Sequence, residues 1–400
     1  MDSHKCNINS ATLRFLNEHW DDDAATLALK AASYPDVDML WVARQVKGRQ
    51  KAKVKIPTWY ANRRLCYPSS ISMEQCSSEY TARYKAELCK GTALLDLTGG
   101  FGVDTAFMSA HFTSTTYVEQ NAELAAIACH NFAELRLDNI EVKTGNGIEY
   151  LSNVPNKVDW IYIDPARRKV NQRKAVLLSD CEPDIIAYKD LLLAKCDNLL
   201  AKLSPLFDIA ELLRFFPDAA EIHVVSVDNE CKELLLLLDG ERHSSPQIFC
   251  VNSQRGGERQ RFSFYLSDEQ QLTLPIAAGN FSYLYEPNAS IQKSGGFKSL
   301  AHAYNLTQVH ANSKLFVSEN HVNDFPGRTF VIEAVVGFSK QELKQGLRGV
   351  DKANITVRNF PLTVAELRKK LGLKDGGGVY LFATTLADGK KVLIRCRKDR

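Results

Sequence analysis

Residues that could hold a nucleotide-like ligand stand at one abrupt change of pattern in this sequence. The stretch from Ala93 to Asp104, ALLDLTGGFGVD, passes from an apolar run to a glycine-rich turn and then to the start of an amphipathic segment. This order is typical of a buried parallel strand that leads into a helix through a tight loop. Glycine permits positive φ and close approach of a ligand to bare backbone, and a helix N-terminus attracts anions.

Acidic residues stand at the ends of two further apolar segments. The run from Thr115 to Val118 leads into Glu119, and the run from Val158 to Ile163 leads into Asp164 and Pro165. Nucleoside-binding α/β units keep an acid after their second strand for the ribose hydroxyls, and open α/β sheets bind ligands at the carboxyl ends of their strands. The sequence therefore predicts one ligand site that contains the glycine turn, Glu119 and Asp164.

Length and composition indicate a multidomain globular protein. The 400 residues exceed one ordinary hydrophobic core, and 45% hydrophobic with 24% charged residues is a usual globular composition. Long strand and helix segments alternate up to about residue 270, which predicts an α/β fold with a parallel sheet. No Gly-Lys-Ser/Thr follows the glycine turn, so a P-loop is not expected.

A net charge of +3 means that any affinity for nucleic acid has to come from local basic patches. One such patch runs from Lys47 to Lys55, where cations recur at every second residue and aromatic residues follow. A row of this kind could grip a phosphate backbone, and a solvated connector is an equally good interpretation. Two other segments rich in cations are Lys390 to Arg400 and the loop that carries Arg167, Arg168, Lys169, Arg173 and Lys174.

The cysteine pattern and the N-terminus bear on the compartment. Ten cysteines are scattered singly, without a C-x-x-C pair or a histidine cluster at metal spacing, which argues against a metal site and a disulfide framework. The first ten residues contain no apolar core of signal-peptide length, and the leucine run Leu234 to Leu238 is too short to span a bilayer. We expect a cytoplasmic protein that binds no metal.

The motifs resemble those of the class I S-adenosylmethionine-dependent methyltransferases. Asp96-x-Thr98-x-Gly100-x-Gly102 is similar to their first motif, with Thr98 in place of the commonest first glycine. Glu119 resembles the acid that holds the ribose of the methyl donor. The resemblance implies a Rossmann-like core and S-adenosylmethionine as cofactor.

The fourth motif of these enzymes, [Asp/Asn]-Pro-Pro-[aromatic], occurs where amino groups are methylated. Asp164-Pro165 resembles its start, while Ala166 and Arg167 replace the second proline and the aromatic ring. The resemblance implies that Asp164 or the Pro165 carbonyl accepts a hydrogen bond from the amino group. Arg167 would stack on the base or bind its phosphate.

Further cofactor contacts are expected from the same resemblance. A segment upstream of the first motif closes over the methionine end of the cofactor in similar enzymes, and Gln75 and Thr81 are its candidates here, with capping and packing as an equally good interpretation. An Asp or Asn after the third strand meets the adenine, and Asn146 can offer both a donor and an acceptor to the base edge. The predicted cofactor-binding residues are Gln75, Thr81, Asp96, Thr98, Gly100, Gly102, Asp104, Glu119 and Asn146.

The whole chain resembles a family of bacterial, largely Bacteroidetes, methyltransferase-like proteins with a THUMP-like C-terminal domain. A core with DPARR, a ferredoxin-like unit with YEPNA and FPGR, and a tail with KANITVRNFP and GGGVYLFATT carry this resemblance. THUMP domains are RNA-binding modules of tRNA- and rRNA-modifying enzymes, so the resemblance implies an RNA substrate. The glycine loop with Asp104 is also similar to that of ribosomal-RNA guanine-N2 methyltransferases, which favours a base amino nitrogen.

Four domains are expected from these patterns. They are a helical domain at 1–65, a seven-stranded Rossmann-like methyltransferase domain at 66–270, a ferredoxin-like α+β domain at 271–336 and a THUMP-like domain at 337–400. The alternatives are an RNA-binding adaptor with a vestigial cofactor pocket and a methyltransferase for a protein or small molecule. The sequence does not determine the RNA, the methylated atom or the oligomeric state.

Overall fold

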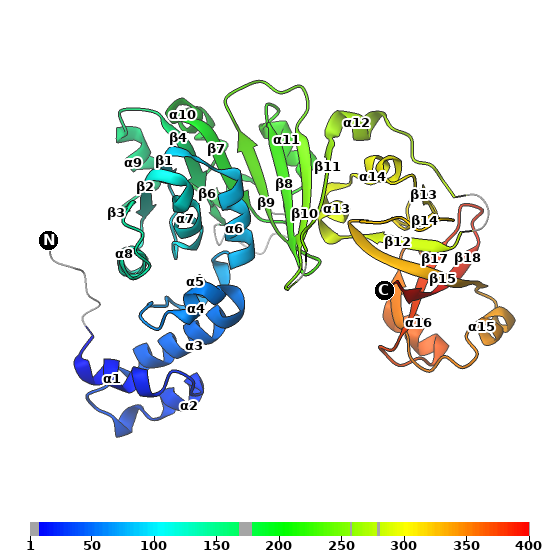
Figure 1. Cartoon of the computed structure of the whole chain (residues 1–400), viewed down its shortest axis with the longest axis horizontal. Helices are drawn as coiled ribbons and strands as arrows, with labels where there is room; N and C mark the ends of the chain where they lie inside the picture. The colour runs from blue at the N-terminus through cyan, green and yellow to red at the C-terminus, as the bar shows by residue number, and fades with distance from the viewer. Residues whose placement is uncertain (1–7, 168–177, 257, 278–280, 400) are drawn as a thin grey trace. The chain divides into compact units, whose positions relative to one another are not determined.

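The computed structural model describes residues 8–167, 178–256, 258–277 and 281–399 (Figure 1). The chain forms two compact units, one made of Met1–Ala220 and Leu235–Arg242 and the other of Glu221–Leu234 and His243–Arg400. No helix within these described ranges combines the length and the apolar character that crossing a membrane requires.

Helices open the first unit, as their apolar spacing predicts. Asp23 and Asp38 cap the second and third α-helices by accepting hydrogen bonds from the backbone N–H groups of Thr26 and Trp41. The elements are α1 (Ser10–Glu18), α2 (Ala24–Leu29), the 3₁₀ helix η1 (Ala31–Ser33), α3 (Met39–Lys55), α4 (Pro57–Ala61), α5 (Ser70–Gln75) and α6 (Glu79–Leu88).

The prediction that the cations from Lys47 to Lys55 form one continuous row is wrong, because these residues belong to helix α3. Two successive residues of such a row are related by a rotation of about 200° around the helix axis, so they lie on nearly opposite sides of the helix. Alternate cations in a helix therefore cannot form one row. Buried apolar residues, among them Val46 and Ala52, continue the helical pattern through the basic segment. Packing of the apolar side of α3 therefore decides that this basic segment is helical.

A parallel sheet follows in the first unit. Its five strands lie in the order β7-β4-β1-β2-β3. They are β1 (Gly91–Asp96), β2 (Phe112–Glu119), β3 (Ile140–Thr144), β4 (Val158–Ile163) and β7 (Cys196–Leu203). The helical segments between and after them are α7 (Val103–Met108), η2 (Ser109–His111), α8 (Ala122–Glu134), α9 (Gly147–Asn153), η3 (Leu178–Asp180), α10 (Lys189–Lys195) and α11 (Ile209–Phe215).

One apolar segment of this region has a different structure from the expected one. Leu191 to Ala201 reads as a single helix, but α10 ends at Lys195 and β7 begins at Cys196. Strand β7 pairs in parallel with β4. A short apolar run fits a buried strand as well as a buried helix, and only the pairing partner distinguishes the two.

The large sheet has nine strands, two more than expected, in the order β11-β10-β8-β9-β7-β4-β1-β2-β3. The additional strands are the leucine-rich β9 (Glu230–Leu238) and β10 (Gln247–Ser253), and the predicted ones are β8 (Glu221–Val227) and β11 (Gln260–Tyr265). Asp228 and Asn229 join β8 to β9 with φ values of 51° and 62°, as in the two-residue turns that hairpins favour. The α/β class and the Rossmann-like core are confirmed.

The second unit also contains a seven-stranded sheet, in the order β13-β14-β12-β15-β18-β17-β16. Its strands are β12 (Tyr283–Pro287), β13 (Thr307–Gln308), β14 (Phe316–Ser318), β15 (Gly327–Gly337), β16 (Asn354–Val357), β17 (Val379–Thr385) and β18 (Lys391–Lys398). Its helices are α12 (Leu266–Gln271), α13 (Ala289–Ser294), α14 (Phe297–Ala303), α15 (Lys340–Gly346) and α16 (Val364–Leu371). The predicted cap of α16 is confirmed, because Thr363 and Glu366 form a capping box.

Strand β15 links the two segments for which separate C-terminal domains are expected. It pairs with β12 on one side and with β18 on the other. The ferredoxin-like and THUMP-like segments therefore share one sheet, and the domain boundaries stay predictions.

Candidate active site

The glycine loop after β1 is shaped by contacts within the chain and by one open position. Gly100 and Gly102 have φ values of 57° and 81°, in the left-handed region, and Gly102 is the N-cap of α7. A methyl group on Gly99 would lie 2.0 Å from the Tyr117 ring, and one on Gly102 would lie 2.7 Å from the Phe132 ring. At Gly100 the nearest atom would be a carbonyl oxygen at 3.8 Å, so the chain leaves space beside this residue.

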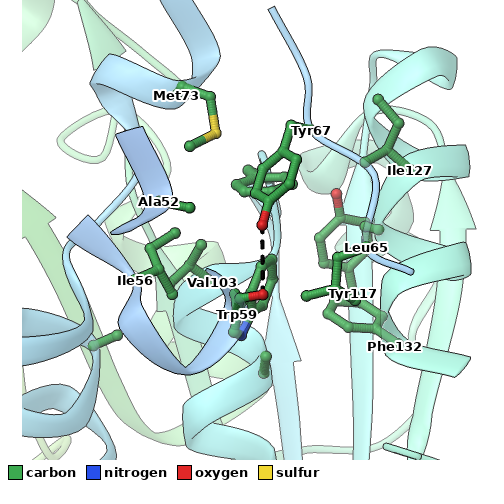
Figure 2. Close-up of a cluster of buried hydrophobic side chains, with 14 of the residues drawn as sticks. Ala52, Ile56, Trp59, Leu65, Tyr67, Met73, Val103, Tyr117, Ile127 and Phe132 are labelled. Atoms are coloured by element: carbon green, nitrogen blue, oxygen red, sulfur yellow. Dashed lines mark hydrogen bonds between the residues drawn. The ribbon is translucent and has the colours of Figure 1, made fainter. Parts of the chain in front are cut away.

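A buried apolar cluster packs the N-terminal helices against this loop. Figure 2 shows Ile56 and Met73 from the helical segment in the same cluster as Tyr117 and Phe132. Phe101 of the glycine loop belongs to it too. The loop is thus supported by the helical segment as well as by the sheet.

Glu119, at the end of β2, holds the glycine loop in place. One oxygen of its carboxylate accepts a hydrogen bond from the Gly100 N–H at 2.7 Å, and the other accepts one from the Asn121 N–H at 2.7 Å. The Tyr117 hydroxyl donates to the Gly100 carbonyl at 2.6 Å. The acid and the open position beside Gly100 are therefore direct neighbours.

Asp96 and Thr98 connect the glycine loop to the loop after β4. Buried Asp96 accepts hydrogen bonds from the Thr98 N–H at 2.9 Å and from the Thr105 hydroxyl at 2.5 Å. Burial raises the pKa of Asp96 to about 7. The Thr98 hydroxyl accepts a hydrogen bond from the Asp164 N–H at 2.6 Å, an interaction that a glycine at this position could not make.

Asp104 lies in a buried cluster of charges. Its Oδ2 accepts hydrogen bonds from the Ser77 and Tyr162 hydroxyls, both at 2.7 Å. The Lys85 Nζ lies 3.2 Å from its Oδ1, and the Lys202 Nζ lies 3.8 Å from its Oδ2. Burial raises the pKa of Asp104, whereas the two ammonium groups and the hydroxyls of Ser77 and Tyr162 lower it, and the net pKa is lowered.

Asp164 follows β4 and is 35% exposed. The Lys202 Nζ lies 2.5 Å from its Oδ2. Pro165 is buried, and the backbone of Arg167 pairs with Cys181 where the short strands β5 (Ala166–Arg167) and β6 (Cys181–Glu182) meet. The Arg167 side chain and the four following predicted cations, Arg168, Lys169, Arg173 and Lys174, lie outside the described part of the chain.

Comparisons with known proteins place this arrangement in a family. Family models described as a ferredoxin-like domain and a THUMP domain-like domain match residues 283–326 and 327–398. The crystal structure of a putative methyltransferase from Porphyromonas gingivalis W83 is 35% identical in sequence, with a TM-score of 0.86, over 98% of this chain and 98% of that one. This chain belongs to the same family of methyltransferase-like proteins.

More remote methyltransferase structures align with only part of this family member. An rRNA methylase from Streptococcus thermophilus aligns over 40% of this chain and 94% of its own, at 13% identity and a TM-score of 0.30. A putative methyltransferase from Streptococcus mutans in complex with SAH aligns over 40% of this chain and 94% of its own, at 11% identity and a TM-score of 0.30. No curated protein shows significant similarity to this chain.

Three predicted cofactor residues of this methyltransferase-like protein have local structural contacts or lie exposed. The Thr81 hydroxyl donates to the carbonyl of Ser78 at the start of α6. Asn146 caps α9, its Oδ1 accepting hydrogen bonds from two backbone N–H groups, and its side chain is exposed. Gln75 is exposed at the end of α5. Their roles toward a cofactor stay predictions.

Sequence reasoning missed the polar groups around Asp104. Ser77 and Tyr162 supply hydroxyls, and Lys85 and Lys202 supply the charges. One signal was present for Lys202, a lysine within the apolar segment LLAKL, since a charge in a buried strand needs a partner. Nothing in the sequence pattern identifies that partner.

Proposed function

We propose that this protein transfers a methyl group from S-adenosylmethionine to an amino nitrogen of a base in tRNA or rRNA. The observation that carries the proposal is the open position beside Gly100 with the Glu119 carboxylate next to it. Glu119 is the last residue of β2 and Asp164 follows β4, and these strands are the two neighbours of β1 in the sheet. Both acids lie at the carboxyl ends of their strands, where open α/β sheets bind ligands.

The residues around Gly100 fit S-adenosylmethionine, which would supply an electrophilic methyl group. Each Glu119 oxygen accepts one backbone hydrogen bond, and a carboxylate has about four acceptor positions, so ribose hydroxyls can be bound as well. The NH₂ group of exposed Asn146 can donate to the base edge of the adenine while its oxygen caps α9.

Asp164 would orient the substrate. An exocyclic amine is a poor nucleophile while its lone pair is delocalised into the ring. A carboxylate that accepts a hydrogen bond from this amine, with the Pro165 carbonyl beside it, favours the form with a localised lone pair and holds the nitrogen in line with the methyl group. This role would be exerted mainly in the transition state.

RNA is the substrate class that the domain composition of this chain supports. The THUMP domain-like match at residues 327–398 is the feature in favour of it. An adaptor without activity, or an enzyme acting on a protein or small molecule, would share the cofactor pocket but would not methylate RNA.

Cofactor binding is tested by calorimetric titration of S-adenosylmethionine into the wild type, Glu119→Gln and Glu123→Gln. Glu119→Gln keeps the size of the side chain but removes the charge, and loss of one or two hydrogen bonds to a charged group weakens binding about 10- to 100-fold. Glu123 lies nearby on α8 and is exposed, so its variant should bind like the wild type. Equal affinity of all three proteins would place the pocket elsewhere.

The reaction is tested by single-turnover transfer of a labelled methyl group to RNA from a strain that lacks this protein. Mass spectrometry of the nucleosides then identifies the base and the atom. Transfer to an exocyclic amine is the expected result. Donor binding without transfer to any RNA fraction would favour the adaptor.

A further inference from the structure

The charge cluster in the first unit joins four charged side chains that are far apart in the sequence. Asp104 lies at its centre, and Asp164 and Lys85 lie at its two ends, with Lys202 between the two aspartates. The side chain of Lys85 is 0% exposed, that of Lys202 is 13% and that of Asp164 is 35%. Asp164 is therefore the most accessible of these charged groups.

The sheet register brings Lys202 beside Asp164. In the parallel pairing of β4 with β7, Ile163 lies opposite Ala201. The next residues of the two strands, Asp164 and Lys202, consequently lie next to each other at the carboxyl edge, and their charged atoms are 2.5 Å apart.

The ammonium of Lys202 is also fixed from its other side. Asp104 lies 3.8 Å from it and is itself held by the hydroxyls of Ser77 and Tyr162. Lys85 supplies a second positive charge to Asp104. The two lysines balance the two aspartates, so Asp104 does not draw Lys202 away from Asp164.

Stability is a poor explanation for four charges in this position. Replacing a buried ion pair by apolar side chains of similar volume is often neutral or stabilising, because desolvation costs as much as the attraction returns. The cluster ends at the residue to which we assign the substrate amine. A role toward that residue accounts for its arrangement.

We propose that Lys202 is a positioning residue, whose ammonium orients the Asp164 carboxylate so that it accepts the hydrogen bond from the substrate amine. This inference rests on the proposed function. The ion pair engages Oδ2 and leaves Oδ1 of the same carboxylate outside it. Asp164 can thus be held and accept a further hydrogen bond at once.

The first test compares single-turnover rates of Lys202→Met and Lys202→Arg with that of the wild type. Misplacement of a reacting group by about 1 Å can lower a rate about 10²-fold, and we expect a loss of this order for Lys202→Met. Affinities for donor and RNA should change less than about twofold, because the pair acts on orientation. Lys202→Arg keeps the charge and should recover part of the rate.

Lys157→Met is the matched control. Lys157 forms an ion pair with Asp197, which belongs to strand β7 like Lys202, and the side chain of Lys157 is 55% exposed. This variant should transfer methyl groups at the wild-type rate. Equal losses in Lys202→Met and Lys202→Arg, together with a lower melting temperature, would reduce Lys202 to a structural role and overturn the proposal.

A second measurement does not depend on activity. Crystal structures of wild type and Lys202→Met, without donor or RNA, should show the Asp164 carboxylate turned away from its wild-type position in the variant. An unmoved carboxylate would overturn the positioning role even if the proposed function holds. If the wild type methylates no RNA, the proposed function fails separately, and the crystal structures still decide whether Lys202 places Asp164.

Discussion

Asp96 and Asp104 are buried aspartates on either side of the glycine loop, and their surroundings shift their pKa values in opposite directions. Burial raises the pKa of Asp96 to about 7, although the Thr105 hydroxyl and the Thr98 N–H donate to it. Burial acts on Asp104 in the same direction, but Lys85 and Lys202, together with the hydroxyls of Ser77 and Tyr162, lower its pKa below the ordinary value. The difference lies in the neighbouring charges.

Asp96 should make stability depend on pH between about 4 and 7. The unfolded chain loses this proton near the ordinary pKa of 3.8 and the folded chain near 7, so the folded state holds the extra proton in between. The free energy of unfolding should therefore fall as the pH rises, by at most about 4 kcal/mol. Urea unfolding at pH 4.5 to 8 should show a flatter dependence for Asp96→Asn. An unchanged slope would contradict the raised pKa.

Asp104 should stabilise the fold in the opposite pH range. Its folded pKa lies below 3.8, so its contribution is present above that pH and is lost as the pH falls through the folded pKa. Asp104→Asn removes one member of a buried charge cluster and should lower the free energy of unfolding by about 3–5 kcal/mol at pH 7. Urea unfolding at pH 7 measures the loss, with Asp197→Asn on the exposed pair as the control.

At the scale of elements, α3 decides which basic residues of the segment from Lys47 to Lys55 remain exposed. The Lys51 ammonium pairs with the Glu74 carboxylate, and the Lys55 ammonium donates to the carbonyls of Met73 and Glu74. Arg49 is buried against the rings of Trp20 and Tyr60. Most of the expected cationic row therefore contributes to the structure of the first unit.

Salt dependence of RNA binding tests this assignment. Were Lys51, Lys53 and Lys55 all to contact phosphates of a single strand, their joint replacement by alanine would lower the slope of log affinity against log salt by about 2. Since only Lys53 of the three is exposed, we expect a decrease of at most about 0.7. Lys53→Ala alone should give the same decrease. A decrease near 2 would show that the helix releases its lysines to RNA.

The glycine loop permits two substitutions with different effects. Gly99→Ala brings a methyl group against the Tyr117 ring and should destabilise the fold by about 1–3 kcal/mol through overpacking. Gly100→Ala meets no close atom but has a left-handed φ, which costs about 1–2 kcal/mol, and its methyl group enters the proposed cofactor space. Thermal melting and donor titration of both variants measure this. Gly100→Ala should lose affinity beyond its loss of stability, and retained affinity would contradict the proposed pocket.

At the scale of the whole molecule, β15 makes the C-terminal segments interdependent. A chain that ends at Pro326 respects the boundary between the two family models but lacks β15, the partner of β12. Unpaired strand edges are prone to open or associate. In hydrogen exchange, the amides of β12 from Tyr283 to Glu286 should lose protection in this truncated protein. Full protection would show that the ferredoxin-like segment folds without the THUMP-like one.

The sequence by itself determined the features that are encoded locally. The glycine turn, Glu119 after one strand and Asp164 after another are signals within a few residues, and the capping box at Thr363 is of the same kind. Together with the longer motifs they were enough to predict the fold class and the family. The roles of the individual site residues stay predictions.

Only the tertiary structure decided which groups meet. Asp104 contacts Ser77, Tyr162 and Lys202, which are 27 to 98 residues away in the chain. These contacts depend on which strands become neighbours, and the hydrophobic periodicity of one segment does not identify its neighbour. For the same reason, the sequence predicted neither strand β9 nor the contacts of the α3 lysines. An apolar run or a row of cations has no fixed conformation until a partner packs against it.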